Sequence, residues 1–393
     1  MNQPETPAGK PVGVTAPQGF AAASGTAGLK SSAAPDLALV HNLGPRFDAA
    51  AVFTSNTVVA APVQWTRQVV KDGQLKAVIL NSGGANACTG PDGFADTHAT
   101  AEAVATALGI GAIDVAVCST GIIGQRLPID KIIHAVPALQ ASETLDAGAA
   151  AAAAIMTTDT FAKQAGYQGD GWSVGGMAKG AAMLSPALAT MLAVITTDAV
   201  ADAATLDQAL RSAVRTTFDR VDTDGCMSTN DTVLLLASGA SGVSAEPAEL
   251  AEAVRSVCDT LAAAMAEDAE GAAHVITVTV TGAASDDDAL IAARAIARNA
   301  LFKCAIFGND PYWGRVLAAA GATDVVFDPD ATTVAFNGVT VCRGGIAVPG
   351  ASVDIHDRQV DVVADLGAGS GTATVRTTDL TYDYVRLNAE YPT

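Results

Sequence analysis

The stretch "AAMLSPALATMLAVITTDA" at residues 181–199 reads as a buried strand with an unusual beginning. Its apolar run Met191–Ile195 has the length and the side chains of a strand buried on both faces. Immediately before this run stands a single hydroxyl residue, Thr190, which follows Ala189. A β-branched threonine at a strand start usually serves packing, so a chemical role for Thr190 has to be argued from the rest of the chain.

The composition predicts a globular protein with a substantial core. The chain has 393 residues, of which 50% are hydrophobic, and this is enough for two domains or one large one. No window reaches the ~18 uninterrupted apolar residues that a membrane span needs. The polar, proline-containing start has no apolar segment of the kind found in export signals. We therefore expect a soluble, cytoplasmic protein.

The charge of the chain argues against polyanionic partners. The formal net charge is −19 at pH 7, whereas binding to nucleic acid or to an anionic membrane needs a basic face. We expect neither a nucleic-acid nor a membrane partner. A substrate carboxylate would have to be held by local cations against the overall field, and Lys163, Lys179 and Arg315 are the candidates.

The cysteines and histidines form no metal-binding pattern. The six cysteines lie far apart without a CxxC pair, and the five histidines lack HxxxH or HExxH spacing. We therefore expect no metal site. The glycine-rich "GAGSGTATV" at 367–375 has no helical pattern after it, which predicts a hairpin turn and not a dinucleotide-binding loop.

The first half of the chain alternates strand-like and helix-like segments. Residues 12–66 read as short strands joined by turns. The segment "LKAVILNSGGANACTG" predicts a strand, and a helix is expected from about Ala95 to Leu108. A second strand, "IDVAVCSTGIIG", runs into Thr120 and Gly121. Strand ends that open into small polar loops hold ligands in many α/β folds.

The second half continues the alternation and then changes character. An alanine-rich helix over "LDAGAAAAAA" precedes Thr157, and a long helix is expected from about Pro247 to Ala273. The alternating "HVITVTVTGA" predicts an edge strand. Because residues 283–288 are acidic and rich in turn residues, we expect a main domain over 1–285 and a smaller α+β domain over 286–393.

Several different polar motifs occur along the chain, and their order is specific. They are "NSGGANACTG", "CSTGIIG", "AIMTTDT", "GGMAKGAAMLSPALATML", "STNDT", "DAEG", "DPYWGRV" and "VRLNAEY". Over essentially the whole chain they resemble the ornithine acetyltransferase family, arginine-biosynthetic proteins that cleave themselves into α and β chains. The resemblance implies an α/β fold, an αββα layered sandwich of the self-cleaving N-terminal-nucleophile type, with a smaller C-terminal α+β domain.

The resemblance also implies roles for individual residues. In the family the cut falls before the threonine of an "ATML" motif, which places it here between Ala189 and Thr190. The α chain would be 1–189 and the β chain 190–393, with Thr190 as the nucleophile. Thr120 and Gly121 match the oxyanion hole of the family. The positions that match substrate contacts are Thr157, Lys179, Thr190, Glu270, Asn388 and Thr393.

An amino-terminal threonine makes chemical sense in this chain because no Ser-His-Asp arrangement is evident. The new α-amine can act as the base. Its free pKa of about 7.7–8.0 leaves roughly a tenth of it neutral at pH 7, far more than a lysine of pKa about 10.4. Attack of the same hydroxyl on the preceding carbonyl can drive the cleavage, and strain in the backbone around it would help.

The reaction implied is acetyl transfer from N2-acetyl-L-ornithine to L-glutamate through an acetyl ester on Thr190. One amide is exchanged for another, so no cofactor is required. Acetyl-CoA stays open as a further donor, which would make the protein a bifunctional glutamate N-acetyltransferase. A self-processing aminopeptidase or amidohydrolase and a degenerate amino-acid-binding paralogue are the alternatives. The family further implies assembly of α and β chains into a heterotetramer or a larger complex.

The chain departs from the family pattern at four positions. These are Ala182, Met227, His274 and Tyr312. None of them is the nucleophile or an oxyanion residue. We therefore expect the departures to affect substrate detail and cleavage rate more than the type of reaction.

Overall fold

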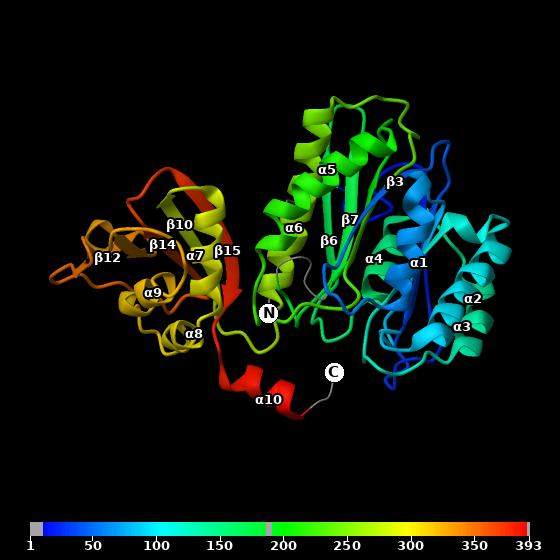
Figure 1. The fold of residues 1–393 in the computed structure, drawn as a ribbon. Helices are drawn as coiled ribbons and strands as arrows, with labels where there is room; N and C mark the ends of the chain where they lie inside the picture. Colours follow the sequence, from blue (N-terminus) through cyan, green and yellow to red (C-terminus); the bar gives the residue numbers. More distant parts are fainter. Residues whose placement is uncertain (1–10, 186–190, 391–393) are drawn as a thin grey trace.

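The structure, a computed structural model, describes residues 11–185 and 191–390. Three sheets and their covering helices form a mixed α/β fold (Figure 1). In these two ranges no helix is both long and apolar enough to cross a membrane.

Two sheets build the larger unit. The first has the order β1-β2-β4-β5, with bounds Phe20–Gly25, Leu37–Asn42, Ala77–Asn81 and Val115–Ser119. The second has the order β3-β9-β8-β7-β6, with bounds Asp48–Phe53, Thr232–Ala237, Leu192–Thr197, Ser173–Lys179 and Lys163–Gln168. The expected strand after Thr190 is therefore β8, an interior strand parallel to β9 and antiparallel to β7.

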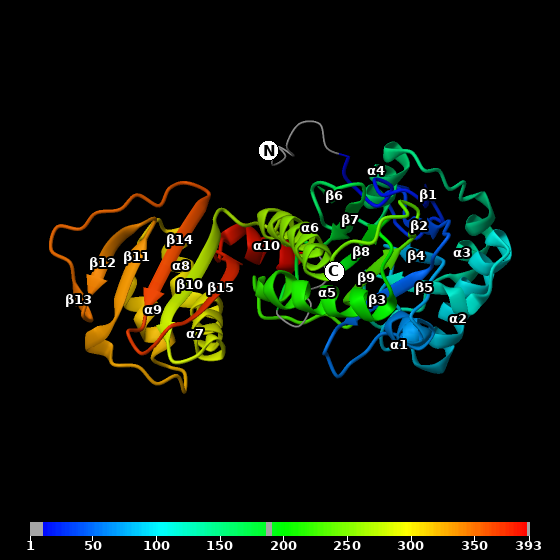
Figure 2. The same ribbon diagram turned by 90° about the horizontal axis from the view of Figure 1, so that it is seen from above.

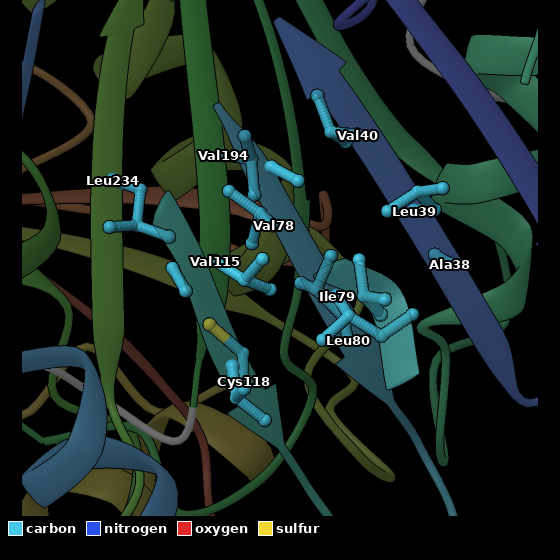
Figure 3. Packing of buried hydrophobic residues seen from close by; sticks show 14 of the residues in the cluster. Ala38, Leu39, Val40, Val78, Ile79, Leu80, Val115, Cys118, Val194 and Leu234 are labelled. Carbon is cyan, nitrogen blue, oxygen red and sulfur yellow. The ribbon is translucent and has the colours of Figure 1, made fainter. Parts of the chain in front are cut away.

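The two sheets pack face to face around one core. Alternate side chains of a strand point to opposite faces, so Val194 of β8 and Leu234 of β9 contact the first sheet. Figure 3 shows both near Val78 and Val115. Their neighbour Ile195 faces the helices on the other side of the second sheet. Burying each such Val or Leu side chain contributes roughly 1.5–3 kcal/mol.

Helices cover the outer faces of both sheets. On the first sheet they are α1, α2, α3 and α4, with bounds Ala61–Val69, Gly90–Leu108, Ile129–Ala135 and Leu145–Ala154. On the second they are α5 and α6, with bounds Ala203–Thr216 and Pro247–Glu267. Figure 2 shows the resulting helix, sheet, sheet, helix order. The expected αββα sandwich is confirmed.

Local signals account for many of the helix starts. The side chain of Asp202 accepts a hydrogen bond from the Thr205 N–H at the start of α5, and Thr144 accepts from Ala147 at the start of α4. Helix α1 corrects the expectation of strands up to residue 66. Its Pro62 lies in the first turn, where the missing N–H costs nothing.

The smaller unit is a six-stranded sheet covered by helices. Its order is β13-β12-β11-β14-β10-β15, with bounds Ile346–Ala347, Val339–Arg343, Thr333–Phe336, Gln359–Asp365, Val275–Ala283 and Gly371–Thr378. Its helices are α7, α8 and α9, with bounds Asp286–Arg298, Ala300–Phe307 and Trp313–Ala320. Short 3₁₀ helices span Val70–Asp72, Ala112–Asp114, Val136–Ala138, Phe218–Arg220 and Pro329–Ala331.

The strand β10 corrects two expectations. It lies between β14 and β15 and is not an edge strand; its alternation arises because Val278 and Val280 face the core of the unit while Thr279 lies on the other face. The glycine-rich loop after β14 passes to the far side of β10 and does not close a hairpin. A boundary at residue 285 would separate β10 from its sheet, so we propose that the smaller unit begins with β10.

The last helix, α10 (Tyr382–Glu390), extends from the smaller unit towards the larger one (Figures 1 and 2). Thr381, just before it, donates a hydrogen bond from Oγ1 to the Gly271 carbonyl (2.6 Å). A Cβ on Gly271 would lie 2.4 Å from the Tyr384 nitrogen. Glycine is therefore required for this close approach, which brings the C-terminal helix to the end of α6.

Candidate active site

Lys179, the last residue of β7, is the centre of the candidate site. Its side chain is buried, and its Nζ donates a hydrogen bond to the Thr120 Oγ1 (3.3 Å). Burial lowers the pKa of Lys179, although the carboxylates of Asp159, Asp231 and Glu270 oppose this change. Within the described ranges no carboxylate lies at salt-bridge distance from its ammonium. A buried cation without an ion-pair partner is costly unless an anion binds there.

Thr120 and Gly121 lie directly after β5. The Thr120 N–H donates to the Asn81 carbonyl (3.0 Å), and its carbonyl accepts from the Gly84 N–H (3.0 Å). Gly121 has φ +136°, and a Cβ there would lie 2.6 Å from the Gly84 nitrogen. The loop thus needs glycine at this position, because any larger residue would push apart the two strand ends.

Hydrogen bonds through Asp159 link Thr157 to the backbone next to Lys179. The Thr157 N–H donates to Asp159 Oδ2 (3.0 Å), while Asp159 Oδ1 accepts from the Gly180 N–H (2.7 Å), next to Lys179. Lys163 lies between Asp159 and Asp268, with its Nζ 2.6 Å from an oxygen of each. Lys163 is therefore neutralised within the protein and is not free to hold a substrate carboxylate.

Asp159 is ionised more readily than an ordinary aspartate. Burial opposes its charge, but Lys179 and Lys163 outweigh the burial and lower the pKa of Asp159 to about 2. Its carboxylate therefore stabilises the fold above the ordinary pKa, 3.8, and this contribution is lost as the pH falls towards about 2.

This acid sensitivity can be measured with Asp159→Asn. We expect the difference in free energy of unfolding between wild type and Asp159→Asn to shrink by about 2 kcal/mol between pH 5 and pH 2, because only the wild type has this carboxylate to protonate. Urea titrations at stepped pH give the difference. A difference that stays constant over this range would contradict the assignment.

Glu270 and Asn388 meet at the C-terminal helix. The Asn388 Nδ2 donates to Glu270 Oε2 (3.3 Å), and the Glu270 N–H donates to the Ala181 carbonyl (2.9 Å). Glu270 Oε1 is buried and has no hydrogen-bond partner among the described residues. Beside Glu270 lies a cavity of about 830 Å³, which reaches Phe307 and Tyr382. The free oxygen is available to a cationic group.

The described candidates form two groups of contacts, which the Glu270 N–H joins through the Ala181 carbonyl, two residues after Lys179. Thr120 contacts Lys179, Asp159 links Thr157 to the backbone beside Lys179, and Asn388 contacts Glu270. Three of the candidate residues, Ala189, Thr190 and Thr393, lie outside the described residues. The nearest described neighbour of the nucleophile candidate is Met191, whose N–H donates to Asp231 Oδ1 (3.0 Å).

Two residues of the site escaped the sequence analysis. Asp159 and Asp231 both stand inside the quoted motifs "AIMTTDT" and "STNDT", where an aspartate among hydroxyl residues was the available signal. Burial raises the pKa of Asp231 well above its ordinary value, more than the hydrogen bonds from Met191 and Ser228 lower it. The third cation candidate, Arg315, lies on α9 and donates to the Leu301 carbonyl, so it belongs to the smaller unit.

Residues 11–185 and 191–390 contain no cluster of three histidine, cysteine or acidic side chains placed to hold an ion. Of the departures from the family pattern, Tyr312 is 51% exposed on the smaller unit, and His274 is buried against Asp379 (2.8 Å). Neither contacts Lys179 or Thr120.

Comparisons with known proteins agree over nearly the whole chain. A model of the ArgJ family matches residues 21–393. The arginine biosynthesis bifunctional protein ArgJ of Streptomyces coelicolor is 59% identical over 379 residues, which cover 96% of this chain and 99% of the relative. The protein of the same name from Mycobacterium tuberculosis strain H37Rv is 59% identical over 390 residues, 96% of either chain.

A solved structure is similar in sequence as well. The ornithine acetyltransferase of M. tuberculosis, complexed with ornithine, is 58% identical, and the match covers 47% of this chain and 97% of that chain with a TM-score of 0.45. The family model and the curated relatives together cover almost every residue discussed above. The chain belongs to the ArgJ family, as do the arginine biosynthesis bifunctional proteins of S. coelicolor and M. tuberculosis.

Proposed function

We propose that this chain moves the acetyl group of N2-acetyl-L-ornithine to L-glutamate through an acetyl ester on Thr190. The membership in the ArgJ family supports an acetyltransferase of arginine biosynthesis. The observation that carries the substrate assignment is a pair of groups of opposite charge, the buried Lys179 and the half-buried Glu270, whose Oε1 is itself buried and has no hydrogen-bond partner among the described residues.

These two groups are complementary to an amino acid with a cationic side chain. Lys179 has no ion-pair partner among the described residues, so a substrate carboxylate would complete its surroundings and raise its lowered pKa again. Glu270 Oε1 is free to accept a hydrogen bond from the side-chain ammonium of ornithine. Because Lys179 is desolvated before binding, its contact with a substrate carboxylate would be strong.

The active form requires one self-cleavage. The hydroxyl oxygen of Thr190 attacks the carbonyl carbon of Ala189, the carbon–nitrogen bond of that peptide breaks, and the freed α-amine takes up a proton. Water then hydrolyses the resulting ester, which leaves a carboxylate on Ala189 and a free hydroxyl on Thr190. The new amine becomes the base for the second reaction.

Acetyl transfer repeats the same chemistry on the substrate. The Thr190 oxygen attacks the acetamide carbonyl while the α-amine of Thr190 accepts the hydroxyl proton. The bond to the ornithine nitrogen breaks, and that nitrogen leaves with the proton. The amine of glutamate then attacks the ester and displaces the Thr190 oxygen, which is protonated again.

In this proposal Thr120 and Gly121 stabilise the oxyanions of both reactions. Because Lys179 donates to the Thr120 oxygen, the hydroxyl hydrogen of Thr120 stays available as a donor. Thr120→Ala should lower kcat per cleaved molecule by about 10²- to 10³-fold and change KM much less. Steady-state kinetics at fixed cleaved-enzyme concentration measures this.

The matched variant for that experiment is Thr120→Ser, which keeps the hydroxyl. It should retain most of the wild-type turnover. Equal kcat values for Thr120→Ala and wild type would remove Thr120 from the oxyanion hole.

The experiment that tests the proposed function combines mass and product analysis. Intact-mass spectrometry of the purified protein should give two chains, 1–189 and 190–393. The cleaved protein, given N2-acetylornithine, should form N-acetylglutamate when glutamate is present. Free acetate formed equally fast without an acceptor would indicate a hydrolase, and an uncut, inactive chain would indicate a binding paralogue. A parallel assay with acetyl-CoA as donor decides whether the chain is bifunctional.

We further propose a cytoplasmic heterotetramer of two α and two β chains, or a larger complex of them. Light scattering on the cleaved protein should then give at least the mass of two full chains. A single αβ pair in solution would contradict this assembly.

A further inference from the structure

Residues 222–232, "DTDGCMSTNDT", form a connected segment that contacts both sides of the proposed cleavage site; we name it the clamp segment. It runs from the end of the 3₁₀ helix after α5 to the first residue of β9. None of its residues has a role in the proposed reaction, although it carries three aspartates that are mostly buried.

On the side before the cut, the clamp segment holds Met183 and Leu184. Asp224 Oδ2 accepts a hydrogen bond from the Met183 N–H (2.8 Å), and the Thr223 N–H donates to the Leu184 carbonyl (2.7 Å). Met183 has φ +54°, a left-handed conformation that a non-glycine residue keeps only when its surroundings impose it. The contact with Asp224 is one such constraint.

On the side after the cut, the clamp segment holds Met191. Asp231 Oδ1 accepts from the Met191 N–H (3.0 Å), and the Thr232 N–H donates to the Met191 carbonyl (3.3 Å). Asp231 is fully buried, and its Oδ2 has no hydrogen-bond partner in the described part of the chain. Burying a carboxyl oxygen without a hydrogen-bond partner costs free energy of folding. This cost points to a role of Asp231 in its contact with Met191, the residue next to Thr190.

The clamp segment also contacts the end of β5, next to Thr120. The Asn230 Nδ2 donates to the carbonyls of Ser119 (2.9 Å) and Ala85 (2.6 Å). Ser119 is the residue before Thr120. One short segment therefore holds both flanks of the cleavage site and the strand end that carries the oxyanion donors.

Two basic residues of the smaller unit contact the clamp segment. Arg298 of α7 pairs with Asp222 (2.6 Å) and donates to the Ser185 Oγ (3.1 Å). Lys303 of α8 donates from Nζ to the Thr223 carbonyl. The clamp segment is thus complete only when both units have packed together.

We propose that the clamp segment positions the chain for self-cleavage, with Asp231 as the positioning residue after the cut and Asp224 as the one before it. The proposal rests on the proposed cut between Ala189 and Thr190. Attack on a carbonyl needs reacting atoms about 3–3.5 Å apart, and a misplacement of about 1 Å can cost about 10²-fold in rate. The clamp segment holds Met183, Leu184 and Met191, the described residues on either side of the proposed cut, on one stretch of backbone.

The test compares Asp231→Ala with Asp231→Asn in the full chain. Asparagine keeps an Oδ1 acceptor for the Met191 N–H, whereas alanine removes it. We expect Asp231→Ala to cleave at least tenfold more slowly than wild type and Asp231→Asn to cleave within about threefold of it, since positioning needs the acceptor and not the charge. Pulse-labelled cell-free synthesis, followed on denaturing gels, gives the cleavage rates.

Asp198→Ala is the matched control. Asp198 is a buried aspartate beyond the opposite end of β8, where it accepts hydrogen bonds from the Ser173 N–H (2.7 Å) and hydroxyl (3.1 Å). The Asp198→Ala chain should cleave at the wild-type rate. Combining each substitution with Thr190→Ala gives uncut proteins whose thermal midpoints report any general loss of stability.

The outcomes separate the two proposals. If wild type does not cleave, the proposed function fails. If wild type cleaves and Asp231→Ala cleaves equally fast, only the clamp proposal fails. If Asp231→Ala and Asp198→Ala slow cleavage equally, with equal losses of thermal midpoint, the effect is general destabilisation and the positioning role is overturned. Failure of Asp231→Asn to restore cleavage would also overturn it.

Discussion

Thr190→Ala is expected to remain one uncut chain of 393 residues with no measurable acetyl transfer. The substitution removes the hydroxyl that opens the Ala189 peptide bond, and the same hydroxyl would carry the acetyl group in the mature enzyme. Loss of the cut also leaves the α-amine locked in an amide, so the base disappears with the nucleophile. Intact-mass spectrometry and an N-acetylglutamate assay measure the two effects.

Thr190→Ser provides the control for this variant. Serine keeps a hydroxyl at the same position, so it should still cleave and retain some acetyl transfer. Complete cleavage of Thr190→Ala would show that another group cuts the chain. Acetyl transfer by an uncut Thr190→Ala chain would refute the nucleophile assignment itself.

Lys179→Met is expected to lower kcat/KM by roughly 30- to 5,000-fold. Removing one partner of a buried charge interaction typically costs about 2–5 kcal/mol, and in the proposed function Lys179 would both bind the substrate carboxylate and donate to Thr120. Methionine fills the space of the lysine stem without a charge, so the core around β7 should stay packed. Steady-state kinetics with N2-acetylornithine, at fixed cleaved-enzyme concentration, measures the loss.

Lys76→Met is the matched control for Lys179→Met. Lys76 pairs with Asp114 (2.9 Å) at the opposite end of the first sheet from Thr120. Its loss should leave kcat/KM unchanged. If Lys179→Met retained wild-type kcat/KM, the substrate carboxylate would have to be held elsewhere.

The sequence predicted the elements whose patterns are local. The strand that follows Thr190 and the alanine-rich helix were expected and are present as β8 and α4. The loop at Thr120 and Gly121 was also expected at a strand end, and it lies there because β5 stops at Ser119. Each of these rests on a few consecutive residues, which is the range over which periodicity and turn chemistry are informative.

Expectations that depended on distant partners were less accurate. Residues 61–66 were expected within a strand region but belong to α1, because a short apolar run fits a buried strand or a helix equally well. Strand β10 was expected at an edge, since its alternating pattern reports one buried face and not the number of neighbouring strands.

The charge network of the site could not be read from the sequence. Lys163 appeared to be a free cation, yet Asp268, which neutralises it together with Asp159, is 105 residues further along the chain. Asp231 is likewise 40 residues from Met191, whose backbone N–H donates a hydrogen bond to it. Such pairings follow from the way the sheets and helices pack together, and a single sequence carries no local signal for them.

The most direct test of the account is to trap the covalent intermediate. The cleaved protein, incubated with N2-acetylornithine in the absence of glutamate, should gain the mass of one acetyl group on the chain that begins at Thr190. Peptide mapping should place that group on the Thr190 oxygen as an ester, and added glutamate should remove it as N-acetylglutamate faster than water removes it as acetate. An acetyl group found on a lysine, or no acetylated chain under conditions of active turnover, would contradict the central claim that Thr190 is the nucleophile.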